Sequence, residues 1–356
     1  MKAQSGQRAS PPRVTVVMPV YNGERHLAAA IDSILAQSYT DFELAIVNDG
    51  STDGTAQIIA SRRDDRIVLV DNAGNFGLSR SLNIGFGLAR GTLLARLDSD
   101  DIAEPQRLGR QVAEMDAQPT TGMVTSWFLE IDDEGRRIAD GRPPSDATSI
   151  RWRLLFGNPI PPSTVMLRRE ALDRLAAHDE SLSYAMDYDL WCRIARASPI
   201  TTVEEVLVQY RRGIDSMTRS NADAVVEEPI RLAVEQMCRV ALDAGIDPAA
   251  FDRSFHLDAQ ALLWRPSLFP SGADAVGTVR KLFHLHDAFS RANGLSISEA
   301  KEHRRALRAR LTRNLLRLSR ANARAGDITR SVAFLAAAGF SRAEVLSRRG
   351  KAAPAT

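Results

Sequence analysis

Three aspartates occur within four residues directly after a short segment suited to a buried strand. Asp98, Asp100 and Asp101 follow residues 93–97. Side chains alternate along a strand, so an extended path sends Asp98 and Asp100 to the same side. Like charges this close repel each other unless a cation or solvent stabilises them, and oxygen ligands suit Mg²⁺ or Mn²⁺ shared with substrate phosphates. The alternative is a solvated acidic turn with Asp101 near the N-terminus of the next helix.

The segments before the aspartates alternate between strand and helix patterns. Strands are predicted at residues 14–18, 42–47, 67–70 and 93–97, and helices at 27–38, around 58–59 and at 78–89. This alternation predicts βαβ units and a mainly parallel sheet with flanking helices, an α/β fold. Ligands of such sheets bind outside the carboxyl ends of the strands. Tyr21, Asp49 and Asp98 follow three of these ends, so we expect them along one edge of the sheet.

The remainder of the chain first continues with mixed elements and then becomes helical. The patterns predict a helix at 105–117, strands at 122–131, 164–167 and 202–210, a hairpin turn at 132–135, a rigid loop at 158–163 and a helix opening at 184. From about residue 224 onward, helical patterns separated by Gly and Pro predict an all-α region. We therefore expect a disordered leader (1–13), an α/β domain (14–220, with halves 14–101 and 102–220) and a helical C-terminal region (224–356).

Composition places the chain among ordinary globular proteins. It has 356 residues, 44% hydrophobic and 25% charged, with a formal charge of +2 that gives no argument for a nucleic-acid partner. Cys192 and Cys238 form no metal or disulfide pattern, which fits a reducing cytoplasm. Residues 1–13 lack the apolar core of a signal peptide, and no stretch approaches the roughly 18 apolar residues of a membrane span. We expect a cytoplasmic location.

The C-terminal region is strongly basic. Residues 301–351 contain 14 Lys or Arg against three acidic residues. The segment 304–320 places four leucines on one helix face and arginines on the remainder: Leu307, Leu311, Leu315 and Leu318. Such a helix can lie on an anionic membrane, where a lipid-linked acceptor would make contact useful. It can equally pack its leucines into a bundle and leave the arginines in solvent.

Four segments in order resemble the inverting family 2 glycosyltransferases with the GT-A fold, above all bacterial members that build exopolysaccharide or lipopolysaccharide. They are VVMPVYN (16–22), VNDGS (47–51), LNIG (82–85) with ARLDSDD (95–101), and DYDLW (187–191). The resemblance spans residues 14 to about 216 and leaves the helical region outside. It implies transfer of a sugar from a nucleotide diphosphate donor to an acceptor hydroxyl, with a nucleotide-binding half (14–101) and an acceptor half (102–220).

The resemblance also implies roles for individual residues. Asp100 is the firmer ligand of a Mn²⁺ or Mg²⁺ ion, and Asp98 and Ser99 face the metal or the ribose. Asp49 accepts a hydrogen bond from a ring N–H of the base, which favours uridine or deoxythymidine donors over cytidine and leaves GDP-sugars open. The remaining expected contacts with the donor come from Pro19, Tyr21, Glu24 and Arg80. A metal neutralises the leaving diphosphate.

Asp187 takes the position of the catalytic base in this resemblance. A helix N-terminus favours its charged form. Asp189 should point away from Asp187 and bond the backbone near the turn.

The chain departs from the family pattern at three places. Met186 stands where relatives have a second carboxylate, and Pro161 and Pro162 stand where many relatives have a histidine. Many relatives have a second histidine after the last strand, and residues 213–216 of this chain contain none. These departures put a third protein metal ligand in question, with Asp215 as the remaining candidate. No histidine falls in a motif, so none is assigned to catalysis, and His284 and His286 are read as surface or packing residues.

Two other functions compete with this interpretation. A nucleotidyltransferase would also bind a nucleotide and metal on an α/β sheet, but it would show a basic glycine-rich loop after the first strand, where this chain has residues 19–23, PVYNG. A catalytically silent binder of sugar nucleotides is the other alternative, and the presence of Asp187 disfavours it.

Overall fold

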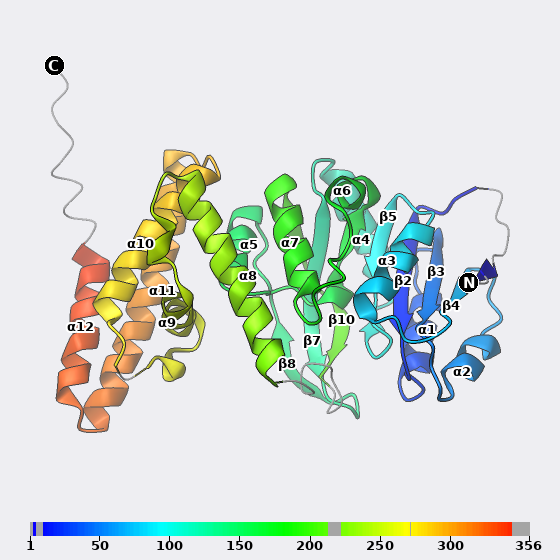
Figure 1. The fold of residues 1–356 in the computed structure, drawn as a ribbon, viewed down its shortest axis with the longest axis horizontal. Coiled ribbons are helices and arrows are strands. Elements are labelled where there is room, and N and C mark those ends of the chain that lie inside the picture. Colours follow the sequence, from blue (N-terminus) through cyan, green and yellow to red (C-terminus); the bar gives the residue numbers. More distant parts are fainter. Residues whose placement is uncertain (1–2, 5–9, 213–221, 271, 344–356) are drawn as a thin grey trace, which may run out of the picture. The chain divides into compact units, whose positions relative to one another are not determined.

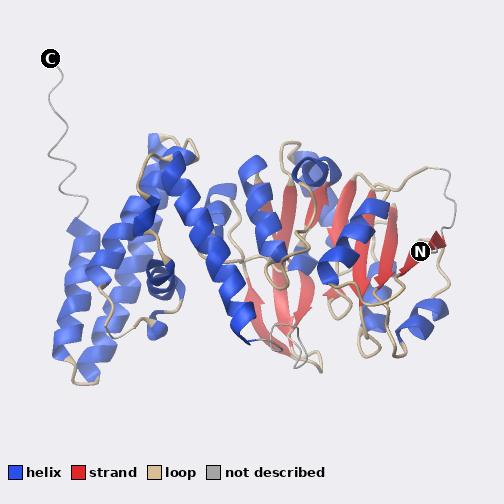
Figure 2. Cartoon of the chain, in the orientation of Figure 1, coloured by secondary structure: helices blue, strands red, loops and turns tan. Residues whose placement is uncertain are grey.

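The structure is a computed structural model that describes residues 3–4, 10–212, 222–270 and 272–343. The chain separates into two compact units, residues 1–229 and 230–356, and the boundary falls within helix α8 (Ala222–Asp243). All described strands belong to the first unit, and the regular structure described in the second is helical (Figures 1 and 2). The predicted α/β class with a helical C-terminal region is therefore confirmed.

The first unit contains the sheet and the helices around it. Its strands are β1 (Ala3–Gln4), β2 (Val14–Val20), β3 (Phe42–Asn48), β4 (Ile67–Asp71), β5 (Leu93–Arg96), β6 (Ile102–Ala103), β7 (Met123–Ile131), β8 (Arg137–Gly141), β9 (Met166–Arg168) and β10 (Ile200–Arg211). Its helices are α1 (Leu27–Leu35), α2 (Thr55–Ser61), α3 (Leu78–Leu88), α4 (Arg107–Ala117), α5 (Ala147–Leu154), the 3₁₀ turn η1 (Pro162–Thr164), α6 (Arg169–Leu175) and α7 (Met186–Ala197).

The sheet has the strand order β1-β4-β3-β2-β5-β9-β7-β10-β6, with β8 paired to β7. Strands β4, β3, β2 and β5 run parallel, and Val17 lies opposite both Ala45 and Arg96. Their carboxyl ends therefore lie at one edge. Beyond β5, the pairings of β9 with β5 and β7 are antiparallel, so the sheet as a whole is mixed. The mainly parallel arrangement predicted from the sequence applies to β4, β3, β2 and β5.

The two faces of β2 are buried against different helices, as its alternating side chains require. Val16 and Met18 belong to a core with α1, α2 and α4. On the other face α3 packs closely (Figure 1), and a side chain added at Gly85 would come within 2.5 Å of a Val17 methyl. This glycine therefore lets α3 approach the sheet and fixes the height of its N-terminal residues above the edge.

Some sequence-based boundaries were wrong for local reasons. Two residues of the leader form β1 and pair with β4 near Val70, so the prediction of a disordered leader was wrong for these two residues. Residues 1–2 and 5–9 are outside the described part. The predicted strand 164–167 is divided, because Pro161 and Pro162 begin the turn η1 and the strand starts only at Met166. Helix α1 ends at Leu35 rather than near residue 38. The sequence interpretation missed α5 and α6.

The second unit is built from amphipathic helices. They are the rest of α8, the 3₁₀ turns η3 (Pro248–Ala250) and η4 (Pro266–Leu268), α9 (Arg253–Trp264), α10 (Ala275–Ala292), α11 (Ile297–Arg324) and α12 (Ile328–Ala343). The four leucines predicted to line one helix face are buried in α11, and Arg313, Arg317 and Arg320 on the same helix are exposed. Helix α11 is therefore a bundle helix. Among the described helices, none combines the length and apolarity needed to span a bilayer.

Candidate active site

A cavity of about 760 Å³ lies at the carboxyl ends of the parallel strands. Its volume is in the range of small-molecule sites. Seven of the residues singled out from the sequence line it: Pro19, Tyr21, Asp49, Asp98, Ser99, Asp100 and Asp187. The cavity therefore brings the base-binding, metal-binding and catalytic candidates into one space.

Asp49 is a buried carboxylate whose hydrogen bonds hold the glycine-rich loop after β4. Its Oδ1 accepts from Asn72 Nδ2 (2.8 Å) and from the N–H of Phe76 (2.9 Å), and its Oδ2 accepts from the N–H of Gly77 (2.9 Å). A carboxylate can accept about four hydrogen bonds. One site on Oδ2 therefore remains for a donor from the cavity, while the other three hold the loop.

Glu24 and Arg80 do not line this cavity. The carboxylate of Glu24 accepts the N–H of Gly54 (2.8 Å), which joins the loops after β2 and β3. The guanidinium of Arg80 lies 4.5 Å from the centre of the Phe76 ring. Both side chains therefore serve loop structure here, and this geometry gives no support to the predicted contacts of either one with the donor. Tyr21, by contrast, lines the cavity and is 50% exposed, so its ring is open to contact with a ligand.

The acidic loop after β5 is neutralised in part by a buried arginine from the strand itself. Arg96, 1% exposed, donates from Nε to Oδ1 of Asp98 (2.8 Å) and from Nη2 to Oδ2 (3.3 Å). The N–H of Asp98 donates to Ser163 Oγ (2.9 Å). The sequence argument considered only a metal or solvent as the stabiliser of the three carboxylates, and that was wrong, because Arg96 pairs with Asp98 directly.

Arg211, at the end of β10, orders the same loop through the backbone. Its Nε donates to the carbonyl of Asp100 (2.8 Å), and its N–H donates to Asp101 Oδ1 (2.6 Å). Asp101 is 1% exposed and precedes β6, so the alternative of an exposed acid at a helix N-terminus is wrong. Burial, together with the charges of Asp100 and Asp98, raises its pKa well above the usual range. Asp101 is a structural residue beneath the cavity.

Asp100 is the carboxylate of this loop that best fits a divalent cation. It lines the cavity, and burial together with the nearby charge of Asp98 raises its pKa to about 6, so its charge is poorly compensated by the protein. Asp98 accepts one hydrogen bond from Arg96 at each carboxylate oxygen, and the remaining lone pairs could supply a second ligand. Among the described residues, no group of three or more His, Cys, Asp or Glu side chains could hold a metal. A bound cation would therefore take its other oxygen ligands from substrate or water.

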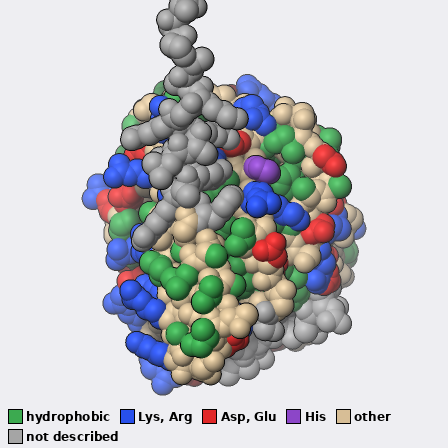
Figure 3. Space-filling view, turned by 90° about the vertical axis from the view of Figure 1, so that its left-hand side faces the viewer, with side chains coloured by type: hydrophobic (Ala, Val, Ile, Leu, Met, Phe, Trp, Pro, Cys, Tyr) green, Lys and Arg blue, Asp and Glu red, His purple; other side chains and the backbone are tan. Residues whose placement is uncertain are grey.

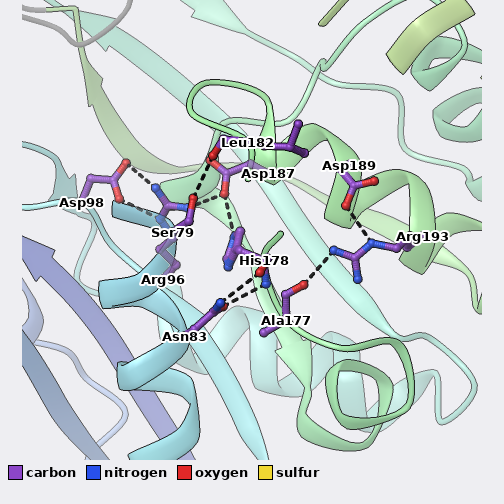
Figure 4. Close-up of polar contacts among 10 residues, drawn as sticks. All are labelled: Ser79, Asn83, Arg96, Asp98, Ala177, His178, Leu182, Asp187, Asp189 and Arg193. Atoms are coloured by element: carbon purple, nitrogen blue, oxygen red, sulfur yellow. Dashed lines mark hydrogen bonds and ion pairs between the residues drawn. The ribbon is translucent and has the colours of Figure 1, made fainter. Parts of the chain in front are cut away.

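Asp187 lies at the start of α7 and is anchored through one oxygen. Its Oδ1 accepts from Arg96 Nη1 (2.5 Å) and lies 2.9 Å from His178 Nε2 (Figure 4). Burial alone would raise its pKa, but the charge of Arg96 and the hydrogen bond of His178 outweigh burial and lower the pKa to about 2. Asp187 is therefore ionised at neutral pH, as an acceptor of protons must be.

His178 was missed from the sequence, where no histidine was assigned to the site. The structure places its fully buried side chain against Asp187, a contact that the sequence did not indicate. The signal was weak because His178 lies in no motif and nine residues before its partner. The two histidines named instead are in the second unit, where His284 is exposed and His286 buried.

Two further side chains define the N-terminus of α7. The carboxylate of Glu228 accepts the N–H groups of Ser183, Tyr184 and Ala185 at 2.8–3.2 Å. Asp189 pairs with Arg193 Nε (2.8 Å), one helical turn on, so the prediction that it bonds the backbone was wrong, although it does point away from Asp187. Residues 213–216, including Asp215, lie outside the described part.

Comparison with known proteins identifies the family. The sequence pattern named Glycosyl transferase family 2 matches residues 15–176. EpsE of Bacillus subtilis (strain 168), to which glycosyltransferase activity is ascribed, is 34% identical over 236 residues, which cover 65% of this chain and 83% of EpsE. The chain belongs to glycosyltransferase family 2.

This family 2 glycosyltransferase is also similar to two other proteins. The amylovoran biosynthesis glycosyltransferase AmsE of Erwinia amylovora is 26% identical over 223 residues, covering 61% of this chain and 83% of AmsE. The crystal structure of S. aureus TarS 1-349 superposes with a TM-score of 0.54 and 18% identity, covering 96% of this chain and 93% of that chain. This structural likeness concerns the fold, and with the family it confirms the GT-A expectation and an enzyme of the glycosyltransferase class.

Proposed function

We propose that this glycosyltransferase moves a sugar from a nucleotide diphosphate, with UDP-sugars favoured, to an acceptor hydroxyl with inversion at the anomeric carbon. The observation that carries the proposal is that Asp49, Asp100 and Asp187 line the same cavity. TarS 1-349 has been solved with UDP and with UDP-GlcNAc. UDP-N-acetylglucosamine is therefore the first donor to test, although that likeness concerns the fold.

The donor nucleotide occupies the Asp49 end of the cavity in this proposal. The remaining lone pair on Oδ2 accepts the ring N–H of uracil or thymine, which cytosine lacks. Tyr21 offers an exposed ring beside it for contact with the base. The loop hydrogen bonds of Asp49 fix the carboxylate in place before the donor arrives.

The diphosphate lies toward the acidic loop. Asp100 would hold Mn²⁺ or Mg²⁺ there, and such an ion would supply charge neutralisation for the leaving diphosphate. Arg211 lines the same part of the cavity and adds positive charge. Asp98 and Ser99 remain available to the ribose.

Asp187 is the general base. The acceptor oxygen attacks the anomeric carbon as the bond from that carbon to the diphosphate oxygen breaks, and the hydroxyl proton passes to Asp187 Oδ2. The electron pair of the broken bond leaves with the nucleoside diphosphate. Because Asp187 is ionised at neutral pH, its Oδ2 can take the proton at the moment of attack.

The acceptor is a saccharide or a lipid-linked saccharide of a bacterial cell-surface polysaccharide. AmsE, named for the biosynthesis of amylovoran, supports a polysaccharide product. The reaction itself takes place at the cytoplasmic side, where nucleotide sugars are made.

We propose peripheral contact of the helical unit with anionic membrane, through α12 rather than through the leucines of α11. Helix α12 exposes Ile328, Val332 and Leu335 (63%, 56% and 49%), which recur at the spacing of one helix face. Helix α11 packs against α12 and carries exposed arginines. Figure 3 shows hydrophobic side chains beside Lys and Arg on this side. An apolar stripe with adjacent positive charge suits anionic lipid.

Replacement of Asp187 by Asn tests the catalytic assignment. Release of UDP from UDP-N-acetylglucosamine and other UDP-sugars is measured with Mn²⁺, with and without saccharide acceptors. Asp187→Asn should bind UDP normally and lower turnover about 100-fold or more. The matched control Asp189→Asn removes a carboxylate two residues away and should keep turnover. An active Asp187→Asn protein would refute the base, and a wild-type protein that binds UDP but turns over no UDP-sugar would indicate a silent binder.

A further inference from the structure

His178 contacts the carboxylate that we assign as the base. It lies in a loop and belongs to none of the sequence motifs. Its Nε2 lies 2.9 Å from Oδ1 of Asp187, and its side chain is fully buried. It stands in the segment between α6 and α7. Figure 4 shows His178 and Arg96 converging on Asp187 from different elements.

Helix α3 holds this histidine in place from one face. Asn83 Nδ2 donates to the carbonyl of His178, and Asn83 Oδ1 accepts the N–H of His178, both at 2.9 Å. The imidazole stacks on Phe86 with 5.7 Å between ring centres and 10° between planes. Ser79, four residues before Asn83, donates to the carbonyl of Leu182 farther along the same loop (3.2 Å). The position of His178 is thus fixed at both backbone atoms and at the ring.

The two oxygens of Asp187 differ in what they contact. Oδ1 accepts from both Arg96 and His178, and the described residues give no hydrogen bond to Oδ2. Asp187 lines the cavity. A carboxylate held at one oxygen by two donors from different directions has little freedom to rotate, so Oδ2 is presented to the cavity in a fixed direction.

The surroundings of the imidazole indicate which nitrogen carries the proton. Nδ1 of His178 is buried and has no hydrogen-bond partner among the described residues. A proton on Nδ1 would be a buried donor without an acceptor, whereas a proton on Nε2 is donated to Asp187. The neutral form with the proton on Nε2 therefore satisfies the site best.

We propose that His178 is a positioning residue for sugar transfer, whose Nε2–H bond to Oδ1 turns Asp187 so that Oδ2 faces the acceptor hydroxyl. Arg96 alone supplies charge, but the Asp187 carboxylate could still rotate about that single contact. The hydrogen bond from His178 reaches Oδ1 from a second direction and prevents this rotation. The inference rests on the proposed role of Asp187 as the base. A packing role for His178 would predict instead that ring size matters and the Nε2 proton does not.

Two substitutions separate these roles. His178→Phe keeps a ring that can stack on Phe86 and removes the donor. His178→Gln removes the ring and keeps an amide N–H donor at the same number of bonds from Cα as Nε2. We expect His178→Phe to lower kcat for UDP-sugar turnover 10- to 100-fold, with KM for the donor and UDP affinity unchanged. His178→Gln should recover most of the loss. Full activity in His178→Phe, or a greater loss in His178→Gln than in His178→Phe, would overturn the proposal.

Combination with the base variant distinguishes failure of this inference from failure of the proposed function. If His178 acts through Asp187, His178→Phe should cause no further loss of turnover in an Asp187→Asn protein. An active Asp187→Asn protein would refute the base itself. An inactive Asp187→Asn protein together with an unimpaired His178→Phe protein would refute only the role of His178.

Nitrogen-15 NMR of labelled histidine tests the geometry without any substrate. The protein has six histidines, and loss of one signal set in His178→Gln assigns His178. We expect a protonated Nε2 and an unprotonated Nδ1 at neutral pH, with the Nε2 proton shifted upfield in Asp187→Asn. A native His178 with its proton on Nδ1 would have nothing to donate to Asp187 and would overturn the proposal even if a variant failed to fold.

Discussion

Arg96 Nη1 lies 2.5 Å from Oδ1 of Asp187, which joins the end of β5 to the start of α7 across 91 residues of sequence. The same guanidinium binds Asp98, so one buried cation pairs with a carboxylate of the acidic loop and with one at the start of α7. A buried charge is stable only with its partners in place. Arg96 therefore couples the acidic loop to the carboxylate that we propose as the base.

Loss of Arg96 should be strongly destabilising. Arg96→Met leaves Asp98 and Asp187 without their shared cation, and we expect the free energy of unfolding to fall by roughly 3–5 kcal/mol. Urea denaturation measures it. Arg62→Met is the control, since Arg62 makes a similar two-contact pair with an Asp32 that is 60% exposed, and it should cost less than about 1 kcal/mol. Equal losses in the two variants would contradict the assigned importance of the buried pair.

The lowered pKa of Asp187 predicts a dependence of stability on pH. A carboxylate with a folded pKa of about 2, below its value of 3.8 in an unfolded chain, stabilises the fold above pH 4 and loses that contribution as pH falls toward 2. The difference in unfolding free energy between wild type and Asp187→Asn should therefore narrow by roughly 2 kcal/mol between pH 5 and pH 2. Denaturant titrations across this range measure it. Glu235→Gln is the control, because Glu235 forms an exposed pair with Arg231. The difference in unfolding free energy between wild type and this variant should change by less than about 1 kcal/mol over the same pH range. A constant difference for Asp187→Asn would be inconsistent with the pairing.

Much of the fold could be predicted because its patterns are local. Alternating apolar strands and amphipathic helices identified the α/β class, and the polar residues after parallel strands identified Tyr21, Asp49 and Asp98 at one edge. The division of the strand expected at 164–167 was missed because it depends on backbone hydrogen bonds. The carbonyls of Pro161 and Pro162 accept the N–H groups three residues on, and these bonds form the turn η1.

The polar partners inside the site could not be predicted, because they depend on contacts between distant segments. Arg96 belongs to the motif ARLDSDD, but it was interpreted only as part of an apolar strand. Its ion pairs with Asp98 and Asp187 were therefore missed. His178 and Asp187 face each other only because Asn83 and Phe86 of α3 position the intervening loop. No local pattern encodes such a contact, and the same is true of the loop bonds that occupy Asp49 and Glu24.

Asp100 should account for the metal dependence of nucleotide binding. We expect wild-type protein to bind UDP more tightly with Mn²⁺ than with EDTA, and Asp100→Ala to abolish the difference because no other described carboxylate of the loop faces the cavity without an ion pair or a buried role. Isothermal titration calorimetry measures both. Asp133→Ala, which removes another carboxylate of the cavity lining, should keep the metal effect. Equal UDP affinity with and without metal in the wild type would refute the metal site.

Asp49 should set the preference for the base. UDP and dTDP should compete better than CDP for the site, because the free lone pair on Oδ2 requires a ring N–H, and Asp49→Ala should erase the preference. The ratio of affinities is the measurement that matters, since Asp49→Ala also releases the loop held through Phe76 and Gly77. Asn72→Ala removes one loop hydrogen bond but keeps the carboxylate, so it should weaken all three nucleotides alike. Equal binding of UDP and CDP by the wild type would rule out this role.

Helix α12 should bind anionic vesicles through its exposed apolar stripe. Val332 and Leu335 are about half exposed on a helix whose opposite face is buried with Phe334. Inserted side chains contribute apolar burial, and the arginines of α11 contribute attraction that salt weakens. We expect the full chain to co-sediment with phosphatidylserine vesicles at low salt, less at high salt and not with neutral vesicles. The double variant Val332→Glu/Leu335→Glu should lose this binding, whereas Leu268→Glu, at an equally exposed leucine in η4, should keep it. Concentration-dependent dimers that the double variant abolishes, without vesicle binding by the wild type, would show instead that a second copy covers this face.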